Sequence, residues 1–379
     1  MSWASPKIVA RSEQSRWRHA GTHRLRLLDP WDCRHERLGT RYARERRGML
    51  VGTNSVLGKP TVEFRESDAN CLDIGLINNM PDAALEATER QFDSLLDSAA
   101  DGMLVRLRVY GMPDVPRTES GRRHVDSFYS DIKELWDRHL DGLIVTGTEP
   151  RAQNLMDEPY WGSLTRVLEW AEHNTHSTVW SCLAAHAAVL HIDGIGRRAL
   201  SHKRFGVFEY ARMSDHRLTV DTPPQLPMPH SRWNDVPEDV LTSCGYRVLT
   251  WSADAGVDAF VKQRRKSQFV FLQGHPEYEA NTLLLEYRRD IRRFLGHERE
   301  TYPTMAQGYF DKPTVEALAA LQRRALADRS EALLEDFTTI LARARVTNTW
   351  RPGATRMYRN WLFDMCAQKA RRVRARQWR

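Results

Sequence analysis

Three residues on two short stretches have the types and spacing needed for nucleophilic catalysis. In VWSCLAAHAAVL (residues 179–190), Cys182 stands where an apolar run gives way to small, helix-favouring residues. In GHPEY (274–278), His275 follows another apolar run and Glu277 stands two residues later. The first amides of a helix stabilise a thiolate at a strand-to-helix turn. An imidazole to move the proton and a carboxylate to orient the imidazole would complete a Cys-His-Glu arrangement.

Each of these residues also has an ordinary structural explanation. A buried cysteine at a strand end is commonly a packed core thiol, so Cys182 alone does not establish catalysis. His186 stands one helical turn after Cys182, and we expect it to be a structural histidine. His275 is the better base because it comes from a second strand end and has a carboxylate nearby. If Cys182 reacts, the backbone N–H of Leu183 would help to hold a developing oxyanion.

Alternating strand and helix patterns supply the elements that must position these residues. Short apolar or alternating runs predict strands at 72–77, 103–111, 141–147, 177–181 and 267–274. Helical patterns lie between them, and the one at 121–139 predicts a single helix. The alternation predicts an α/β fold with a doubly wound, mostly parallel sheet, whose active site lies beyond the carboxyl ends of the strands. The segments NNMP, GTEPR, SCLAAH and GHPEY would meet at that edge.

Composition and pattern divide the chain into three parts. Residues 1–68 are rich in arginine, lack hydrophobic periodicity and predict a disordered basic extension. Residues 69–311 carry the strand and helix alternation of the α/β domain. Residues 312–379 predict a helical region with a basic tail. Within it, residues 313–345 predict a helical hairpin that packs on the body or mediates self-association, and we expect a homodimer.

The basic charge of the chain, with a pI near 9.2, lies at its two ends. Residues 1–48 contain 12 Lys/Arg against 5 Asp/Glu, and the last thirteen residues contain 6 basic and no acidic groups. Residues 49–366 carry a net charge of −6, so a cationic groove for nucleic acid on the folded body is not supported. A non-catalytic protein that binds nucleic acid through its ends is a rival hypothesis, which predicts that removing both ends abolishes function.

Other classes of protein lack support in the sequence. No apolar run is long enough to span a bilayer, and no apolar segment near the N-terminus indicates secretion. The five cysteines are scattered without a CxxC pair, so neither a disulfide framework nor a metal site is expected. These features predict a cytoplasmic protein, in which a thiol is free to react.

The two catalytic stretches resemble known enzyme families. GHPE and a cysteine on a strand-to-helix turn are similar to the class I glutamine amidotransferases, but Trp180 and Ala184 replace the glycines that flank the cysteine in those glutaminases. The chain more closely resembles the homoserine O-succinyltransferase/O-acetyltransferase family, which shares the amidotransferase-like fold. The resemblance lies in ordered blocks that include IGLINNMP, DGLIVTG, VWSCLAAHAAVLHIDGI, HKRFGVFE, PHSRWNDVP, GHPEYEANTLLLEYRRD and NTWRPGATRMYRNWL.

This resemblance implies a role for each matching residue. Cys182 would accept the acyl group from acyl-CoA as a thioester, with His275 as the general base and Glu277 as its acidic partner. Lys203, Ser231 and Arg289 match substrate-binding residues of the family. The implied reaction is acyl transfer to the hydroxyl of L-homoserine in methionine biosynthesis, with acyl-CoA as co-substrate and no metal or redox cofactor.

Arg151 bears on which acyl group is transferred. In the family, the residue at this position is Gly in succinyl-transferring members and Glu in acetyl-transferring members, and this chain has neither. A guanidinium could pair with the free carboxylate of a succinyl group, which favours succinyl-CoA, but it could equally contact the phosphates of CoA or face water. Three alternatives stay open: acetyl-CoA as donor, L-serine as acceptor, and a glutaminase of the amidotransferase type.

Overall fold

The main sheet of the protein has eight strands and contains the predicted parallel core. The computed structural model describes residues 52–53 and 71–377. The strand order is β1-β3-β2-β4-β5-β12-β11-β8, and the first six strands are mutually parallel. Their bounds are β1 Gly52–Thr53, β2 Cys71–Ile77, β3 Leu104–Tyr110, β4 Gly142–Val145, β5 Ser177–Ser181, β8 Arg247–Val248, β11 Ala259–Arg264 and β12 Ser267–Leu272. The predicted α/β fold with a mostly parallel sheet is confirmed.

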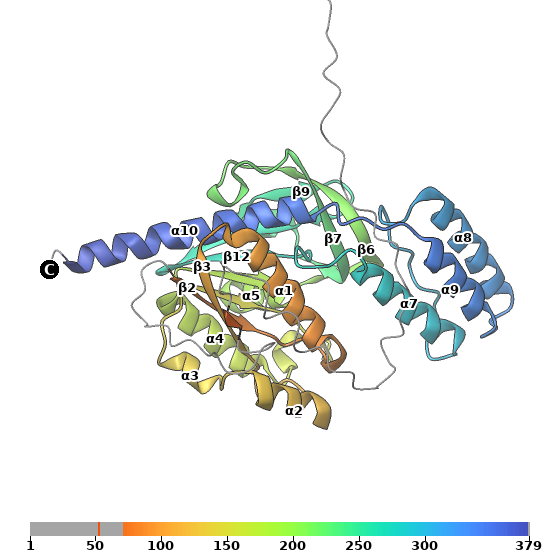
Figure 1. The fold of residues 1–379 in the computed structure, drawn as a ribbon, viewed down its shortest axis with the longest axis horizontal. Coiled ribbons are helices and arrows are strands. Elements are labelled where there is room, and N and C mark those ends of the chain that lie inside the picture. Colours follow the sequence, from red (N-terminus) through yellow and green to blue (C-terminus); the bar gives the residue numbers. More distant parts are fainter. Residues whose placement is uncertain (1–51, 54–70, 378–379) are drawn as a thin grey trace, which may run out of the picture.

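Helices cover both faces of this sheet (Figure 1). Along β4, Leu143 and Val145 face one hydrophobic cluster, and Ile144 between them faces the other. The first cluster includes side chains of α4 (Trp161–Asn174) and α5 (Leu183–Asp193). The second includes side chains of α1 (Leu85–Ala100) and α10 (Arg351–Gln377). Burial on both faces explains why these strands read as continuous apolar runs.

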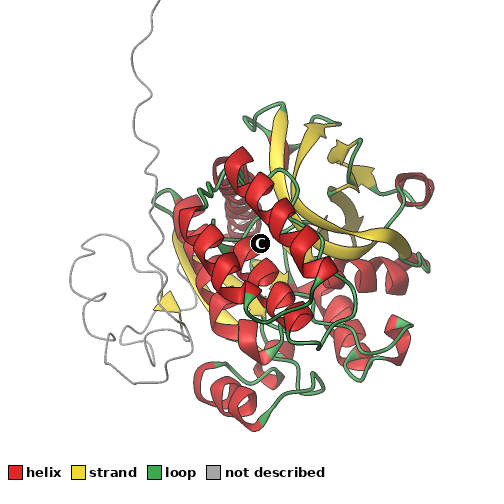
Figure 2. Ribbon diagram, turned by 90° about the vertical axis from the view of Figure 1, so that its right-hand side faces the viewer, coloured by secondary structure: helices red, strands yellow, loops and turns green. Residues whose placement is uncertain are grey.

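A smaller antiparallel sheet stands beside the main one (Figure 2), and the sequence patterns did not predict it. Its strands, in the order β10-β9-β6-β7, are Gly256–Val257, Thr250–Ser252, Arg198–Arg212 and Gln225–Asp235. The long hairpin of β6 and β7 carries Lys203 and Ser231. Helix α6 (Glu238–Ser243) follows it.

The predicted single helix over 121–139 is wrong. The chain forms α2 (Glu119–Phe128) and then the short α3 (Lys133–Trp136). Between them, Tyr129 is extended and the N–H of Ser130 donates to the carbonyl of Val109 at 2.8 Å. A backbone hydrogen bond to the end of β3 therefore interrupts a segment whose polarity pattern is helical throughout.

The C-terminal helices attach to two separate places. Helices α8 (Lys312–Ala327) and α9 (Leu333–Arg343) form the predicted hairpin and share a hydrophobic cluster with α7 (Thr282–Leu295). Helix α10 returns to the main sheet, where Trp361 and Met365 are buried. The predicted extension 1–68 lies outside the described residues, except for Gly52 and Thr53, which pair with β3.

Among residues 52–53 and 71–377, no helix is both long and apolar enough to cross a membrane. Within the same ranges, no group of three or more His, Cys, Asp or Glu side chains is arranged to hold a metal ion.

Candidate active site

Cys182 forms the turn between β5 and α5. Its φ and ψ angles are 53° and −115°, a left-handed conformation that costs a non-glycine residue about 1–3 kcal/mol. The N–H of Cys182 donates to the carbonyl of Leu272 on the neighbouring strand β12 at 2.7 Å. The side chain is only partly buried. The strained turn therefore holds a thiol at the carboxyl edge of the sheet and at the N-terminus of a helix.

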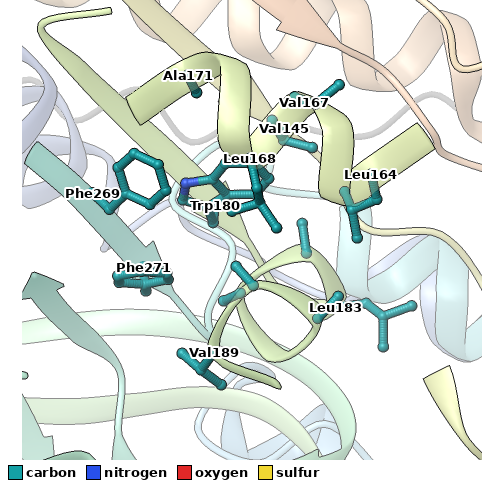
Figure 3. Close-up of a cluster of buried hydrophobic side chains, with 14 of the residues drawn as sticks. Val145, Leu164, Val167, Leu168, Ala171, Trp180, Leu183, Val189, Phe269 and Phe271 are labelled. Carbon is teal, nitrogen blue, oxygen red and sulfur yellow. The ribbon is translucent and has the colours of Figure 1, made fainter. Parts of the chain in front are cut away.

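The residues on either side of this turn are not glycines but buried residues of the hydrophobic core. Trp180, which stands where the amidotransferase pattern has glycine, is fully buried and packs among Leu168, Phe269 and their neighbours (Figure 3). Its indole N–H donates to Thr178 Oγ1 at 2.7 Å, so its polar group is satisfied. Ala184 is also buried. This packing fixes both sides of Cys182 in place.

His275 lies within reach of Cys182 and is oriented by Glu277. The imidazole Nδ1 is 2.8 Å from Glu277 Oε1, and both side chains are buried. Nδ1 is thus engaged, which leaves Nε2 for the hydrogen bond with Cys182. Burial by itself lowers the pKa of His275, but the negative charges of Cys182 and Glu277 outweigh it and hold that pKa well above 6.5. The structure thus brings the three predicted catalytic side chains together, with the His275 ring between the Cys182 thiol and the Glu277 carboxylate.

His186 occupies the other side of the same edge and has a neutral partner. Its Nε2 lies 2.8 Å from the amide oxygen of Gln273. Complete burial lowers the pKa of His186 to about 4, so the ring is neutral at physiological pH. It is the structural histidine expected from the sequence.

Leu183, whose N–H is the predicted oxyanion donor, is the first residue of α5 and borders a small pocket. Gly147 lies against it so closely that a Cβ on Gly147 would stand 2.9 Å from the Leu183 nitrogen. Asn79, Thr148 and Tyr160 line the same pocket. The glycine that ends DGLIVTG therefore keeps space open beside the amide that follows Cys182.

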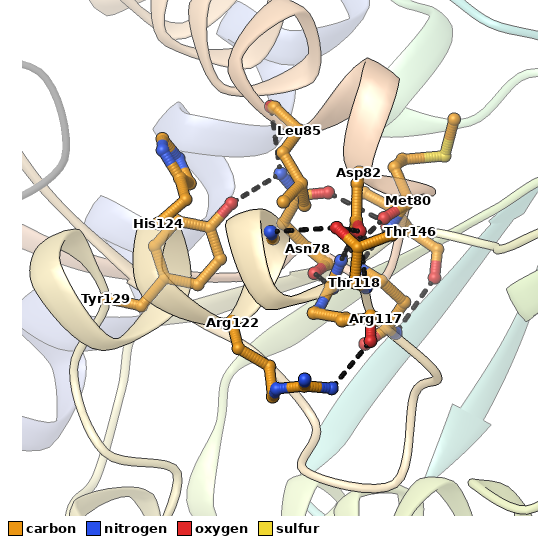
Figure 4. Close-up of polar contacts among 12 residues, drawn as sticks. Asn78, Met80, Asp82, Leu85, Arg117, Thr118, Arg122, His124, Tyr129 and Thr146 are labelled. Carbon is orange, nitrogen blue, oxygen red and sulfur yellow. Dashed lines mark hydrogen bonds and ion pairs between the residues drawn. The ribbon is translucent and has the colours of Figure 1, made fainter.

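A hydrogen-bonded cluster fixes the loop after β2 on the same rim (Figure 4). The buried Arg117 donates to the carbonyls of Asn78 and Met80 at 3.1 and 3.0 Å and pairs with Asp82. Asp82 also accepts the N–H and hydroxyl of Thr118, both at 2.7 Å. The NNMP segment is therefore rigidly held where the strands end.

The three predicted substrate-binding residues meet on two carboxylates that the sequence analysis did not single out. Lys203 Nζ lies 3.6 Å from Glu286 and 3.7 Å from Asp290. Ser231 donates to Glu286 at 2.6 Å, and the half-exposed Arg289 pairs with Asp290 at 3.0 Å. Both carboxylates lie on α7, in the same EYRRD segment as Arg289. The sequence did contain a signal for this cluster. Arg289 and Asp290 follow Glu286 by three and four positions, which places all three on one face of a helix.

Tyr278 joins this group to His275 and was also missed by the sequence analysis. Its ring stacks on His275, with centroids 4.3 Å apart, and its hydroxyl donates to Glu286 at 2.8 Å. It completes the GHPEY motif, so its place beside His275 was visible in the sequence. Its role as a bridge became visible only when α7 was placed.

Arg151 lies in the loop after β4, and its side chain is exposed. Its backbone N–H and that of Ala152 donate to Glu158 at 2.6 and 2.7 Å, which fixes the course of the loop. The same loop carries Glu149, whose charge acts on Arg289. The loop therefore approaches the substrate-binding residues, while no contact of the Arg151 guanidinium with them is present.

Solved structures that resemble this chain include two glutamine amidotransferases. The one from Thermotoga maritima is 13% identical, with a TM-score of 0.39, and the match covers 78% of this chain and 98% of that chain. The one from Methylobacillus flagellatus is 15% identical, with a TM-score of 0.44, over 78% and 95% of the two chains.

Sequence relatives are much closer. The family model described as homoserine O-succinyltransferase matches residues 51–372. Relatives named homoserine O-succinyltransferase include those of Rhodopseudomonas palustris, 47% identical over 80% of this chain and 91% of that protein, and Methylorubrum extorquens, 47% identical over 77% and 86%. The relative of Bradyrhizobium japonicum is 43% identical over 79% and 91%. The predicted resemblance is confirmed, and the chain belongs to the homoserine O-succinyltransferase family of acyltransferases.

Proposed function

We propose that this protein transfers the succinyl group of succinyl-CoA to the hydroxyl of L-homoserine through a thioester on Cys182. The observation that carries the proposal is the contact of His275 with both Cys182 and Glu277, in a member of this family. The product would supply methionine biosynthesis.

In the first half-reaction, the thiolate of Cys182 attacks the carbonyl carbon of the acyl thioester. The developing oxyanion is held by the N–H of Leu183. The carbon–sulfur bond to CoA breaks, and the protonated His275 gives its proton to the leaving CoA thiolate. Acyl-enzyme and neutral His275 remain, so no proton is left over.

In the second half-reaction, the homoserine hydroxyl attacks the thioester. Neutral His275 accepts the hydroxyl proton as the new carbon–oxygen bond forms, and Cys182 leaves as the thiolate. Glu277 stabilises the imidazolium that results, because it lies 2.8 Å from Nδ1. The enzyme returns to its starting charge state without water taking part.

The acceptor amino acid would bind beside Tyr278. Lys203 and Arg289 supply positive charge for its carboxylate, and Ser231 supplies a hydroxyl. Serine is shorter than homoserine by one methylene, a difference worth about 1–3 kcal/mol in a pocket. The choice of homoserine therefore rests on family membership.

The decisive test combines trapping of the intermediate with a substrate panel. Labelled succinyl-CoA without acceptor should leave label on Cys182, and Cys182→Ala should carry no label and show no turnover. Cys244→Ser is the matched control, because Cys244 contacts Lys262 and lies away from the His275 pair. This variant should carry label on Cys182, as the wild-type protein does. Normal turnover by Cys182→Ala would refute the mechanism.

The substrate panel measures CoA release from succinyl- and acetyl-CoA with homoserine and with serine. We expect the succinyl-CoA and homoserine combination to be fastest. Replacing Arg151 by Ala should lower the succinyl-to-acetyl preference if its guanidinium pairs with the succinyl carboxylate. Glutamine hydrolysis without CoA would instead indicate a glutaminase.

The assembly and location of the protein belong to the same proposal. We propose a cytoplasmic homodimer, with the exposed Leu326 and Val315 of the α8–α9 hairpin available for contact. Light scattering of the full chain gives its mass in solution, and a monomer would refute the dimer.

A further inference from the structure

A buried carboxylate that takes no part in the proposed reaction lies behind the GHPEY turn. Asp258 stands between β10 and β11 with 1% of its surface exposed. Its Oδ1 accepts the N–H of Gly274 at 2.7 Å, and its carbonyl accepts the N–H of Gln273 at 3.2 Å. Asp258 therefore binds two successive amides just before His275.

Close packing around Gly274 shows that this contact is specific. A Cβ on Gly274 would stand 2.9 Å from Asp258 Oδ1, 2.9 Å from His230 Nε2 and 2.5 Å from Met228 Cγ. Any larger residue would push the carboxylate away from the turn. The first residue of GHPE is thus small because Asp258 and His230 occupy the space beside it.

The hydrogen bonds of His230 fix its tautomer. Arg232 Nε donates to His230 Nδ1 at 3.2 Å, so a neutral ring carries its proton on Nε2. That nitrogen has no hydrogen-bond partner among the described residues and lies 3.8 Å from Asp258 Oδ1. Burial and the charge of Arg232 hold the pKa of His230 well below 6.5. The ring is neutral and directs an N–H toward the carboxylate.

The charged and titratable groups around Asp258 come from three elements. Arg232 and the neutral His230 lie on β7, while His275 and Glu277 lie on the turn after β12. Tyr210 of β6 packs against His230, with ring centroids 5.3 Å apart, and burial keeps its hydroxyl protonated. Burial raises the pKa of Asp258 to about 6, opposed by the Gly274 N–H and Arg232. At pH 7.5 and above, the group is therefore an anion.

We propose that Asp258 is a positioning residue, whose carboxylate fixes the turn that carries His275. Its negative charge also stabilises the protonated form of His275 beside Cys182. Glu277 contacts the imidazole directly, and Asp258 acts from behind through the backbone. The inference rests on the proposed roles of Cys182 and His275.

Asp258→Asn separates the two contributions, because an asparagine oxygen still accepts the Gly274 N–H while the charge is removed. A nearby anion raises the pKa of every group close to it. The limb of the pH profile that reports loss of the His275 proton lies where Asp258 is an anion, so it should move to lower pH by about one unit. The measurement is the rate of Cys182 alkylation by iodoacetamide from pH 4 to 10, with turnover recorded in parallel.

Thr250→Val is the matched control. Thr250 is buried beside Asp258, and its hydroxyl accepts the N–H of Ala259 at 2.9 Å, so its loss removes a buried hydrogen bond without a change of charge. Its alkylation profile should keep the wild-type midpoints. An unshifted limb in Asp258→Asn, or equal shifts in both variants, would overturn the proposal.

A measurement on the wild-type protein covers the case in which Asp258→Asn does not fold. The NMR signal of the His275 ring should show a step with a midpoint near pH 6, caused by titration of Asp258. A His275 signal that is flat in this range overturns the proposal. Failure of the proposed function is recognised separately, because Cys182→Ala would then retain turnover whatever Asp258 does.

Discussion

Two buried histidines, His186 on α5 and His275 after β12, have pKa values shifted in opposite directions. His275 lies beside the carboxylate of Glu277, and its pKa is held well above 6.5. His186 lies beside the amide of Gln273, and its pKa falls to about 4. Both rings are almost inaccessible to solvent, at 6% and 3% exposure.

The difference lies in the partner and not in burial. Desolvation lowers the pKa of both rings, and only His275 has anions close enough to reverse that effect. The two partners, Gln273 and Glu277, are only four positions apart in the sequence. Four experiments can break or sharpen this comparison.

The largest difference should appear when each histidine is replaced by asparagine. His275→Asn should lower kcat/KM about 10²–10⁴-fold, because the proton carrier is lost. His186→Asn should change it less than about tenfold, because a neutral buried ring carries no proton in the reaction. Release of CoA measures both, and circular dichroism checks that each variant is folded. Equal losses would remove the distinction.

Glu277→Gln should give His275 an amide partner like that of His186 and lower its pKa. An amide oxygen can still accept the Nδ1–H, but loss of the charge lowers the pKa of His275 by about 1–3 units. The population of the thiolate–imidazolium pair and hence the rate at neutral pH should fall about 10–10³-fold. Iodoacetamide labelling of Cys182 across pH tests this, and an unchanged profile would contradict it.

Acid should destabilise the fold through His186. Its folded pKa of about 4 lies below the unfolded value near 6.5, so its stabilisation is complete above pH 6.5 and is lost as the pH falls toward 4. Urea unfolding at pH 7 and pH 4.5 should show a loss that is about 2–3 kcal/mol larger in wild type than in His186→Asn. Equal losses would mean that His186 is already charged in the folded protein.

The smallest effect is expected from Gln273→Glu, which places a carboxylate beside His186. The pKa of His186 should rise by about 1–3 units, as seen by NMR titration. The free energy of unfolding should fall by about 1–3 kcal/mol. In the wild-type protein, Gln273 Nε2 donates to the carbonyl of Val257 at 2.7 Å, and a glutamate carboxylate cannot replace this donor. Gln273→Met is the control, which loses the same donor without adding charge. A rise in pKa in both variants would show that charge is not the cause.

Much of the fold was predictable because local pattern and tertiary environment agree there. The strands β2, β4, β5 and β12 are buried on both faces, so their apolar runs stand out. The α8–α9 hairpin follows its helical periodicity. The interruption after Phe128 was not predictable, because it depends on a hydrogen bond from Ser130 to a strand about twenty residues earlier.

The antiparallel sheet escaped prediction for a related reason. Its strands β6 and β7 alternate between polar and apolar residues imperfectly, and their pairing shifts register between Ala199 and Arg204. The sequence blocks HKRFG and PHSRW were noticed only for their resemblance to a family. Their closeness across the hairpin, which brings Lys203 and Ser231 to one carboxylate, is a tertiary result.

The sequence by itself determined the α/β fold and the family, and it predicted Cys182, His275 and Glu277 as site residues, because strand-end motifs carry these features locally. Only the tertiary structure decided which buried groups are charged. Glu286 and Asp290 bring Lys203, Ser231 and Arg289 together, Gln273 is the uncharged partner of His186, and Asp258 lies behind the GHPEY turn. Charge in a protein interior depends on which partners lie within a few ångströms, and distant segments supply those partners.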